Sequence, residues 1–202
     1  MHGYYKLDLG EGSTITFLQG DITRQDADAI VNAAKSSLMG GGGVDGAIHR
    51  AGGPQILEEC KKIVARQGHL PPGEAVSTAG GRLVAPFVIH TVGPIWRGGL
   101  EGEPGLLANC YRNSLGHADR LGLHNVAFPA ISTGVYGYPI ADAATIAIES
   151  TIDALIAARS VRDVRFVLFN EEFLDVFLQA ARDVVRRRNK NWRLQPIPGT
   201  KE

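Results

Sequence analysis

Short apolar runs alternate with longer segments of helical period along the chain, and this alternation limits the fold more than any other feature. The short runs are rich in β-branched and aromatic residues, as strands are, and lie at residues 15–17, 29–31, 75–79, 87–92, 125–131 and 164–169. The longer segments, in which apolar residues recur every three or four positions, begin at Pro54 and also cover residues 106–121, 139–158 and 171–188. Strands that alternate with helices predict an α/β fold built on a layered sheet, with room for an antiparallel edge strand.

Length and composition favour a single globular domain. The chain has 202 residues, of which 44% are hydrophobic and 21% charged, and these ordinary globular values argue against disorder. We expect one domain over residues 1–188, followed by a basic, proline-containing tail at residues 189–202 with poor order. We expect this domain to be a monomer.

Charge and cysteine content narrow the classes of function. Lys+Arg 21 balance Asp+Glu 21, so no overall field draws nucleic acid to the chain. The basic run at residues 186–193 is interpreted as a solvated helix end in preference to a nucleic-acid patch. Cys60 and Cys110 do not suggest a disulfide framework, and neither has zinc-ligand spacing with His2, His69, His117 or His124. No apolar segment reaches membrane-spanning length. We therefore expect no metal, no membrane partner and a cytoplasmic location.

Two loops of small residues stand directly before predicted helices. The first contains four consecutive glycines, Gly40, Gly41, Gly42 and Gly43, whose backbone N–H groups are not covered by side chains. The second, residues 132–138, follows a predicted strand and precedes Pro139. Because helix N-termini bind anions, the two loops predict a site that grips a pyrophosphate from two sides. A flexible surface loop is the alternative for the glycine run taken alone.

A dinucleotide-binding oxidoreductase is the rival interpretation of the glycines. Gly41, Gly43 and Gly46 match G-x-G-x-x-G. That fingerprint joins its strand directly to a helix and has an acid about twenty residues further on, at the tip of the next strand. Here residues 35–39 intervene and the nearest acids, at residues 58–59, lie within a helical pattern, so the context disfavours this class. A P-loop and a serine-hydrolase elbow are both absent from the sequence.

Four motifs in one order resemble a macrodomain of the MacroD type. They are Gly20-Asp21-Ile22-Thr23, residues 32–49, His90-Thr91-Val92-Gly93-Pro94 and residues 132–138, and the resemblance covers residues 14–187. It implies a three-layer α/β/α sandwich around a mixed central sheet, with ADP-ribose in a cleft at the strand ends. It also implies hydrolysis of ADP-ribosyl esters without a cofactor. The implied substrates are O-acetyl-ADP-ribose and proteins mono-ADP-ribosylated on acidic side chains, with nucleic-acid-linked ADP-ribose as a further partner.

The resemblance assigns four residues to the adenine end of the ligand. Asp21 is similar to the acid that accepts a hydrogen bond from the adenine amino group, with the Ile22 backbone beside it. Phe169 is similar to the residue that packs on adenine, with Asn170 next to it. Without the resemblance, Asp21 would be interpreted as a turn or N-cap residue and Phe169 as a core residue.

The two loops are assigned to the ribose and pyrophosphate. On one side lie Gly40, Gly41, Gly42, Gly43 and Val44, and on the other Ser132, Thr133, Gly134, Val135 and Tyr136. Tyr136 either covers the distal ribose or positions a water molecule.

Asp45 is the candidate catalytic residue. A carboxylate beside a pyrophosphate is electrostatically unfavourable, so its presence suggests the task of activating or orienting the attacking water. The alternative is an N-cap of the following helix, a role compatible with catalysis. His49 lies four residues later, where it shares a helical face with Asp45 and either tunes the carboxylate or simply packs.

The chain departs from the family pattern at Lys35. Asn32 and Ala33 follow the family pattern, and Asn32 either ties the strand end to the loop or contacts ribose. The family usually has a second asparagine where this chain has Lys35. An ammonium that points into the cleft near Asp45 would lower the carboxylate pKa by about 1 to 3 units and weaken it as a base. It could also bind a ribose hydroxyl or an anionic group, and the alternative is a lysine that extends into solvent.

Two hypotheses follow. The first is an ADP-ribosyl hydrolase that cleaves its ester with a water positioned by Asp45, and the second is a reader that binds ADP-ribose without turnover, which Lys35 favours. The leaving group lies outside the motifs, and the attacked atom is either the ester carbonyl or the anomeric carbon.

Overall fold

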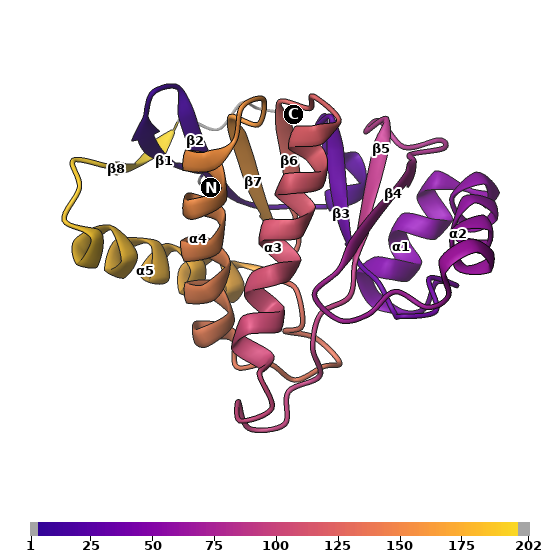
Figure 1. Ribbon diagram of the computed structural model, residues 1–202. Helices are drawn as coiled ribbons and strands as arrows, with labels where there is room; N and C mark the ends of the chain where they lie inside the picture. Colours follow the sequence, from indigo (N-terminus) through magenta and orange to yellow (C-terminus); the bar gives the residue numbers. More distant parts are fainter. Residues whose placement is uncertain (1–3, 198–202) are drawn as a thin grey trace.

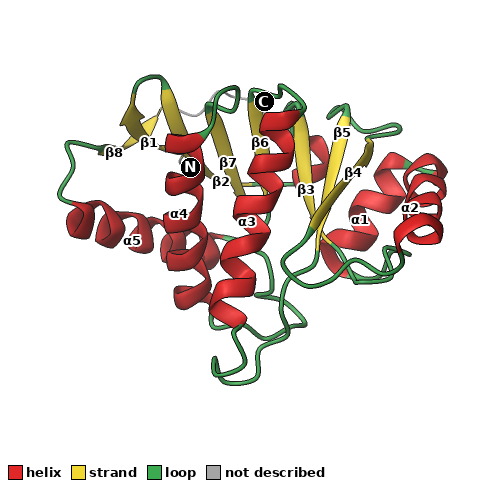
Figure 2. Cartoon of the chain, in the orientation of Figure 1, coloured by secondary structure: helices red, strands yellow, loops and turns green. Residues whose placement is uncertain are grey.

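The computed structural model describes residues 4–197 of the chain. Within this range strands and helices alternate as the sequence predicts (Figure 1, Figure 2). The strands are β1 (Tyr4–Gly10), β2 (Ser13–Gln19), β3 (Ala29–Ala33), β4 (Ala75–Ala79), β5 (Phe87–Thr91), β6 (Asn125–Phe128), β7 (Asp163–Leu168) and β8 (Arg193–Ile197). The helices are the short 3-10 helix η1 (Ile22–Arg24) and α1 (Gly43–Gly52), α2 (Pro54–Gln67), α3 (Glu103–Arg120), α4 (Ile140–Ala157) and α5 (Glu171–Arg188).

One mixed sheet joins the eight strands in the order β4-β5-β3-β6-β7-β2-β1-β8. The five central strands, from β5 to β2, run parallel. The pairings at the two margins of the sheet are antiparallel. At one margin β4 pairs with β5, and at the other β1 pairs with both β2 and β8. The mixed sheet predicted from the resemblance is therefore confirmed.

Helices cover both faces of the sheet. Side chains alternate across each strand, so Val31 and Ile89 join the core under α3, α4 and α5, whereas Ile30 and Val88 join the core under α1 and α2. Figure 1 shows α3 and α4 crossing the same face of the sheet, with α1 and α2 grouped beside β4 and β5. The arrangement is the expected three-layer α/β/α sandwich.

The C-terminal segment differs from the expectation of poor order from residue 189 onwards. Residues Arg193–Ile197 form β8, which pairs with β1 and places Leu194 opposite Leu7. Trp192 and Leu194 pack against the larger core cluster, and this apolar contact orders the segment. Pro196 fits because an edge strand tolerates a residue without an N–H. Residues 198–202 of the predicted tail lie outside the described residues.

Two further differences concern strands. The sequence interpretation did not find β1, and the strand expected at residues 125–131 ends at Phe128. Pro129 follows at once, and the remaining residues form the start of a loop. In the described part of the chain no helix has both the length and the apolar character to cross a membrane.

Candidate functional site

A cavity of about 960 Å³ opens where the parallel strands end. Its walls include residues that follow the carboxyl ends of all five of these strands: Gly20 and Asp21 after β2, Ala34 after β3, Gly93 after β5, Pro129 after β6 and Phe169 after β7. Ligands of open α/β sheets bind at this edge, and the volume suits a nucleotide-sized ligand. The cavity is therefore the candidate functional site.

Most of the predicted site residues meet in this cavity. Those that line it are Asp21, Ile22, Ala33, Lys35, Gly42, Gly43, Val44, Asp45, Ser132, Thr133, Gly134, Val135, Tyr136 and Phe169. Predicted residues outside the lining are Asn32, Gly40, Gly41, His49 and Asn170. Asn32 and His49 nevertheless contact Asp45, as described below, and Gly40 and Gly41 shape the loop that carries it.

The glycine loop needs glycine for its backbone conformation at two positions and for space at Gly46, in the helix that follows. Gly40 and Gly43 have φ values of 78° and 59°, a left-handed conformation that favours glycine. A Cβ on Gly46 would overlap the Gly41 carbonyl oxygen. α1 begins at Gly43, so its first N–H groups face the cavity edge at Val44 and Asp45, where an anion can bind.

The opposite loop is held equally tightly. Ser132 has a φ of 66°, and the Tyr138 N–H donates to its carbonyl at 3.0 Å. The Ser132 hydroxyl is buried and has no hydrogen-bond partner among the described residues. Gly93 lies against this hydroxyl so closely that any Cβ there would overlap it. The loop thus presents an unused hydroxyl at the cavity wall.

Asp45 is buried, with 4% of its surface exposed, and its two carboxylate oxygens have different surroundings. Asn32 Nδ2 donates to Oδ1 at 2.8 Å, and His49 Nε2 lies 3.4 Å from the same oxygen. Oδ2 has no hydrogen-bond partner among the described residues. One oxygen is therefore held by the protein, and the other is a buried acceptor without a protein partner, on a residue that lines the cavity.

Lys35 lies in the cavity wall close to Asp45. Lys35 Nζ and Asp45 Oδ2 are each 3.2 Å from the point where a Cβ on Gly41 would sit, so the two atoms are separated by at most twice that distance. The two groups form no direct ion pair, and Lys35 is exposed although it also lines the cavity. Both expectations for Lys35 are compatible with this position.

The end of the cavity that the resemblance assigns to adenine includes exposed residues. Asp21 caps η1, where Oδ1 accepts from the Thr23 backbone N–H at 2.9 Å and from the Thr23 hydroxyl at 2.7 Å. Phe169 is 87% exposed at the end of β7, so core packing does not explain it. Asn170 caps α5 by accepting from the Phe173 N–H at 2.9 Å and does not line the cavity.

Several lining residues escaped sequence reasoning. They are Gly20, Ala34, Ala47, Arg50, Gly93, Pro129, Ala130, Val167 and Phe173. The sequence contains a signal for Ala47 and Arg50. They follow Gly43 at successive spacings of four and three residues, which places all three on one face of α1. Arg50 is a second cationic residue in the cavity lining, in addition to Lys35.

A group with possible metal ligands lies behind the cavity. Ligand atoms of His49, Cys60 and His90 fall within 4.8 Å of one another. Burial lowers the pKa of His90 to about 3 and raises the pKa of the Cys60 thiol to about 12, so the imidazole is neutral and the thiol protonated. Both ring nitrogens of His90 already have partners, Asn32 Nδ2 at 3.1 Å and Thr78 Oγ1 at 2.9 Å. The group therefore functions as a hydrogen-bonded core in this fold and offers no free His90 lone pair to a metal.

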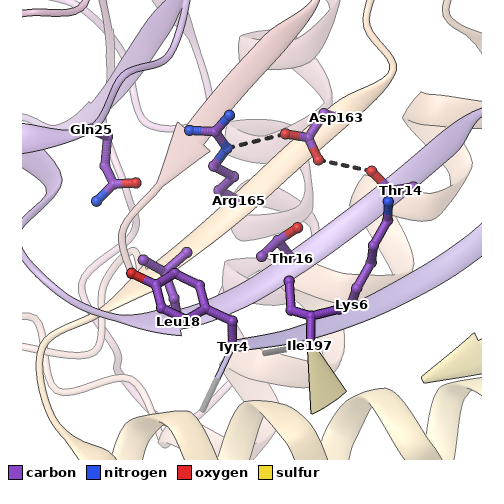
Figure 3. Close-up of a pocket in the computed structure, with 9 residues that line it drawn as sticks. All are labelled: Tyr4, Lys6, Thr14, Thr16, Leu18, Gln25, Asp163, Arg165 and Ile197. Atoms are coloured by element: carbon purple, nitrogen blue, oxygen red, sulfur yellow. Dashed lines mark hydrogen bonds and ion pairs between the residues drawn. The ribbon is translucent and has the colours of Figure 1, made fainter. Parts of the chain in front are cut away.

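A second hollow, of about 360 Å³, is lined by residues of β1, β2, β7 and β8 (Figure 3). Two of its charged side chains are paired, because Arg165 Nε donates to Asp163 Oδ2 at 3.1 Å, and Asp163 Oδ1 accepts from the Thr14 hydroxyl at 2.8 Å. Arg165 also donates to the Asp26 carbonyl. Arg165 and Asp163 are thus satisfied inside the protein.

Known proteins share this architecture. The macro domain family profile matches residues 31–147. An O-acetyl-ADP-ribose deacetylase of Cronobacter turicensis is 59% identical over 158 residues, which are 78% of this chain and 90% of the relative. The solved macrodomain of Oceanobacillus iheyensis with ADP has a TM-score of 0.87 and 40% identity, and the match covers 93% of this chain and 100% of that one.

A macrodomain of Trypanosoma brucei in complex with ADP-ribose is also similar. It has a TM-score of 0.76 and 38% identity, over 86% of this chain and 72% of that one. The profile match, the sequence identity and the shared fold agree, and this chain belongs to the macrodomain family.

Proposed function

We propose that the protein binds ADP-ribose in the cavity and hydrolyses ADP-ribosyl esters, among them O-acetyl-ADP-ribose and proteins mono-ADP-ribosylated on acidic side chains. The observation that carries the proposal is the asymmetry of Asp45, a cavity-lining residue whose Oδ1 is held by Asn32 while its buried Oδ2 has no hydrogen-bond partner among the described residues. Relatives at 55–59% identity that are named O-acetyl-ADP-ribose deacetylases support the same reaction class.

The proposed pose follows the chemistry of the walls. Adenine lies on the exposed Phe169 ring with its amino group towards Asp21, where a carboxylate oxygen can accept a hydrogen bond. The pyrophosphate lies between the start of α1 and the loop at residues 132–136, which offer backbone N–H groups and the Ser132 hydroxyl. The distal ribose then reaches Asp45, and Tyr136 covers it.

In the proposed reaction, Asp45 Oδ2 accepts a proton from a water molecule held between the carboxylate and the ester. The water oxygen bonds to the acyl carbon, the ester C–O bond breaks, and the ribose oxygen takes the proton from Asp45 and leaves as a hydroxyl, which restores the carboxylate. The products are ADP-ribose and a carboxylic acid. For a linkage at the anomeric carbon, water attack at that carbon gives the same products. Reaction in ¹⁸O-labelled water separates the two routes, because the label enters the acid in the first and the ribose in the second.

We propose that Lys35 moderates this reaction. Its ammonium lies near Asp45 Oδ2, and a positive charge there attracts the negative charge that the carboxylate loses when it takes a proton from water. The same observation favours the second candidate function, an ADP-ribose reader with little turnover. The two functions differ in product release and not in affinity.

The experiment that tests the proposal compares the wild type with Asp45→Ala. Free ADP-ribose is followed chromatographically from O-acetyl-ADP-ribose and from a glutamate-linked mono-ADP-ribosylated protein, and ADP-ribose binding is measured by calorimetry. We expect release by the wild type, loss of release in Asp45→Ala, and similar affinity in both. Absence of release by a wild type that binds ADP-ribose would make the protein a reader.

Three further properties belong to the proposal. We propose that residues 1–188 act as one domain, that the protein works as a monomer, and that it resides in the cytoplasm. Both cysteines are buried and free, which suits a reducing compartment. ADP-ribose attached to nucleic acid is a further candidate substrate, which the same release assay can test with a terminally ADP-ribosylated oligonucleotide.

A further inference from the structure

Three polar side chains connect Asp45 to the interior of the sheet. Asn32 Nδ2 donates to Asp45 Oδ1 at 2.8 Å and lies 3.1 Å from His90 Nδ1, and His90 Nε2 lies 2.9 Å from Thr78 Oγ1. Their exposed fractions are 4% for Asp45, 0% for Asn32 and His90, and 3% for Thr78. We name Asp45, Asn32, His90 and Thr78 the buried polar network.

Strand register builds this network. β3 pairs with β5 in parallel, and Asn32 lies opposite His90 in that register. β4 pairs with β5 on the other side, so that Thr78 on β4 reaches the same imidazole. The network therefore crosses three adjacent strands and ends at a carboxylate in the first turn of α1.

The hydrogen-bond directions can be derived from the Asp45 end. A carboxylate only accepts, so the Asn32 atom that faces it at 2.8 Å is the amide nitrogen. The same nitrogen faces His90 Nδ1, and because an amide NH₂ only donates, Nδ1 must be the acceptor. A neutral imidazole with an unprotonated Nδ1 carries its proton on Nε2.

The Thr78 end is compatible with this tautomer. The Thr78 hydroxyl can donate its single proton to the Ala79 carbonyl at 3.1 Å. Its oxygen then accepts from the proton on His90 Nε2, at 2.9 Å. The Asn32 end thus fixes the tautomer of His90, and the Thr78 hydroxyl can match it.

The groups around the imidazole are compatible with this assignment. Cys60 Sγ lies 3.8 Å from Nε2, and its thiol is protonated because burial raises its pKa to about 12. The His49 ring centroid is 6.1 Å from that of His90. Burial keeps His90 neutral by lowering its pKa to about 3.

We propose that His90 is a positioning residue for the reaction: its Nε2-protonated tautomer accepts from Asn32, which fixes the amide so that the other N–H holds Asp45 Oδ1 and leaves Oδ2 facing the cavity. The proposal rests on the proposed function, in which Asp45 Oδ2 positions the water. It adds that Thr78 sets the orientation of Asp45 through His90. Thr78 lies on β4, the strand that pairs with β5, which carries His90.

The first test uses Thr78→Val, which replaces the hydroxyl by a methyl group of similar size. The Nε2–H then loses its acceptor, and the alternative Nδ1–H tautomer would place two donors face to face at Asn32. We expect kcat for ADP-ribose release to fall by about 10- to 100-fold, with KM and ADP-ribose affinity within about twofold of wild type. Thr78→Ser restores the hydroxyl and should restore kcat.

The matched control is Thr151→Val. Thr151 is fully buried in α4 and its hydroxyl has no hydrogen-bond partner among the described residues. This variant makes the same isosteric change elsewhere in the core, and we expect wild-type kcat. A fall in kcat caused by loosened packing alone would appear in Thr151→Val as well.

The second test compares His90→Asn with His90→Gln. The Asn amide oxygen can take the place of Nδ1 and accept from Asn32, whereas the longer Gln amide reaches the Nε2 position and leaves Asn32 without an acceptor. We expect the Asn variant to keep at least tenfold more kcat than the Gln variant at matched KM. Nitrogen-15 spectra of histidine-labelled wild type should show His90 with its proton on Nε2.

The outcomes separate this proposal from the proposed function. If Asp45→Ala abolishes release but Thr78→Val and His90→Gln turn over like the wild type, the positioning role is overturned and the proposed function stands. An Nδ1-protonated His90 in the spectra also overturns it, whatever the activities. If Asp45→Ala releases ADP-ribose at the wild-type rate, the proposed function fails, and the nitrogen-15 result still decides whether the hydrogen-bond directions are right.

Discussion

The two ends of the cavity are built in opposite ways. At one end Asp45 is 4% exposed and tied through Asn32 into the sheet, and at the other Phe169 is 87% exposed with its ring free at a strand end. A buried, hydrogen-bonded carboxylate suits chemistry, which depends on fixed geometry. An open aromatic ring suits recognition, which needs contact area that a ligand can cover. We name these the reaction end and the recognition end.

The largest expected effect is at the reaction end. Asp45→Asn keeps the size and the acceptor for Asn32 but removes the charge, so the variant can no longer take a proton from water. We expect kcat to fall by about 10²- to 10⁴-fold with affinity for ADP-ribose within a few-fold of wild type. Steady-state kinetics with calorimetry checks this. A change confined to KM would show that Asp45 contributes to recognition and would remove the contrast between the two ends.

Phe169→Ala addresses the recognition end. Stacking of a base on an aromatic ring contributes about 1–3 kcal/mol, so we expect KM and Kd to rise by about tenfold while kcat is kept. Thermal stability should not change, because the side chain is exposed. Val135→Ala is a matched control, since Val135 also lines the cavity, is fully exposed and carries no ring to stack. Equal losses in the two variants would argue against stacking on Phe169.

Lys35→Asn sharpens the comparison within the reaction end. Lys35→Asn removes a positive charge that opposes proton transfer to the carboxylate, and we expect kcat to rise by about three- to tenfold. Lys35→Met, which keeps much of the length without the charge, should raise kcat as well. A wild-type rate in both variants would show that this lysine does not moderate the reaction.

The smallest expected effect is on stability at acid pH. In the folded state the pKa of His90 is lowered to about 3. Below about pH 6.5 the unfolded state therefore binds a proton at this histidine and the folded state does not. The contribution of His90 to the free energy of unfolding is therefore fully present above about pH 7 and decreases as the pH falls towards 3. Between pH 6.5 and 5.5 the decrease is about 1 kcal/mol, and His90→Asn should lack it. Urea unfolding at a series of pH values measures the difference between the two proteins.

Much of the fold and of the cavity lining could be predicted from local signals. Alternating apolar periods located the central strands and the long helices, and the glycine run and the small-residue loop located both walls of the cavity. Local signals failed where long-range packing decides. β8 exists because Leu194 and Trp192 meet the core beside β1, which lies almost the whole chain away in sequence.

The roles of individual residues were less accessible than their positions. The sequence interpretation assigned Asn32 to the ligand or to a structural tie, and only the parallel register of β3 with β5 shows that it holds Asp45 and faces His90. His90 stood in a motif without a role, because its partners come from two other strands and from the core. The direction in which the Lys35 ammonium points is likewise set by the folded glycine loop.

The strand β8 also bears on the behaviour of the protein at high concentration. The outermost strands of the sheet are β8 and β4, each of five residues, and short edges offer few backbone groups to a neighbouring sheet. In β8 one of the five residues is Pro196, which has no N–H to donate, and Arg193 adds a positive charge. The same segment that extends the sheet thus discourages edge-to-edge aggregation.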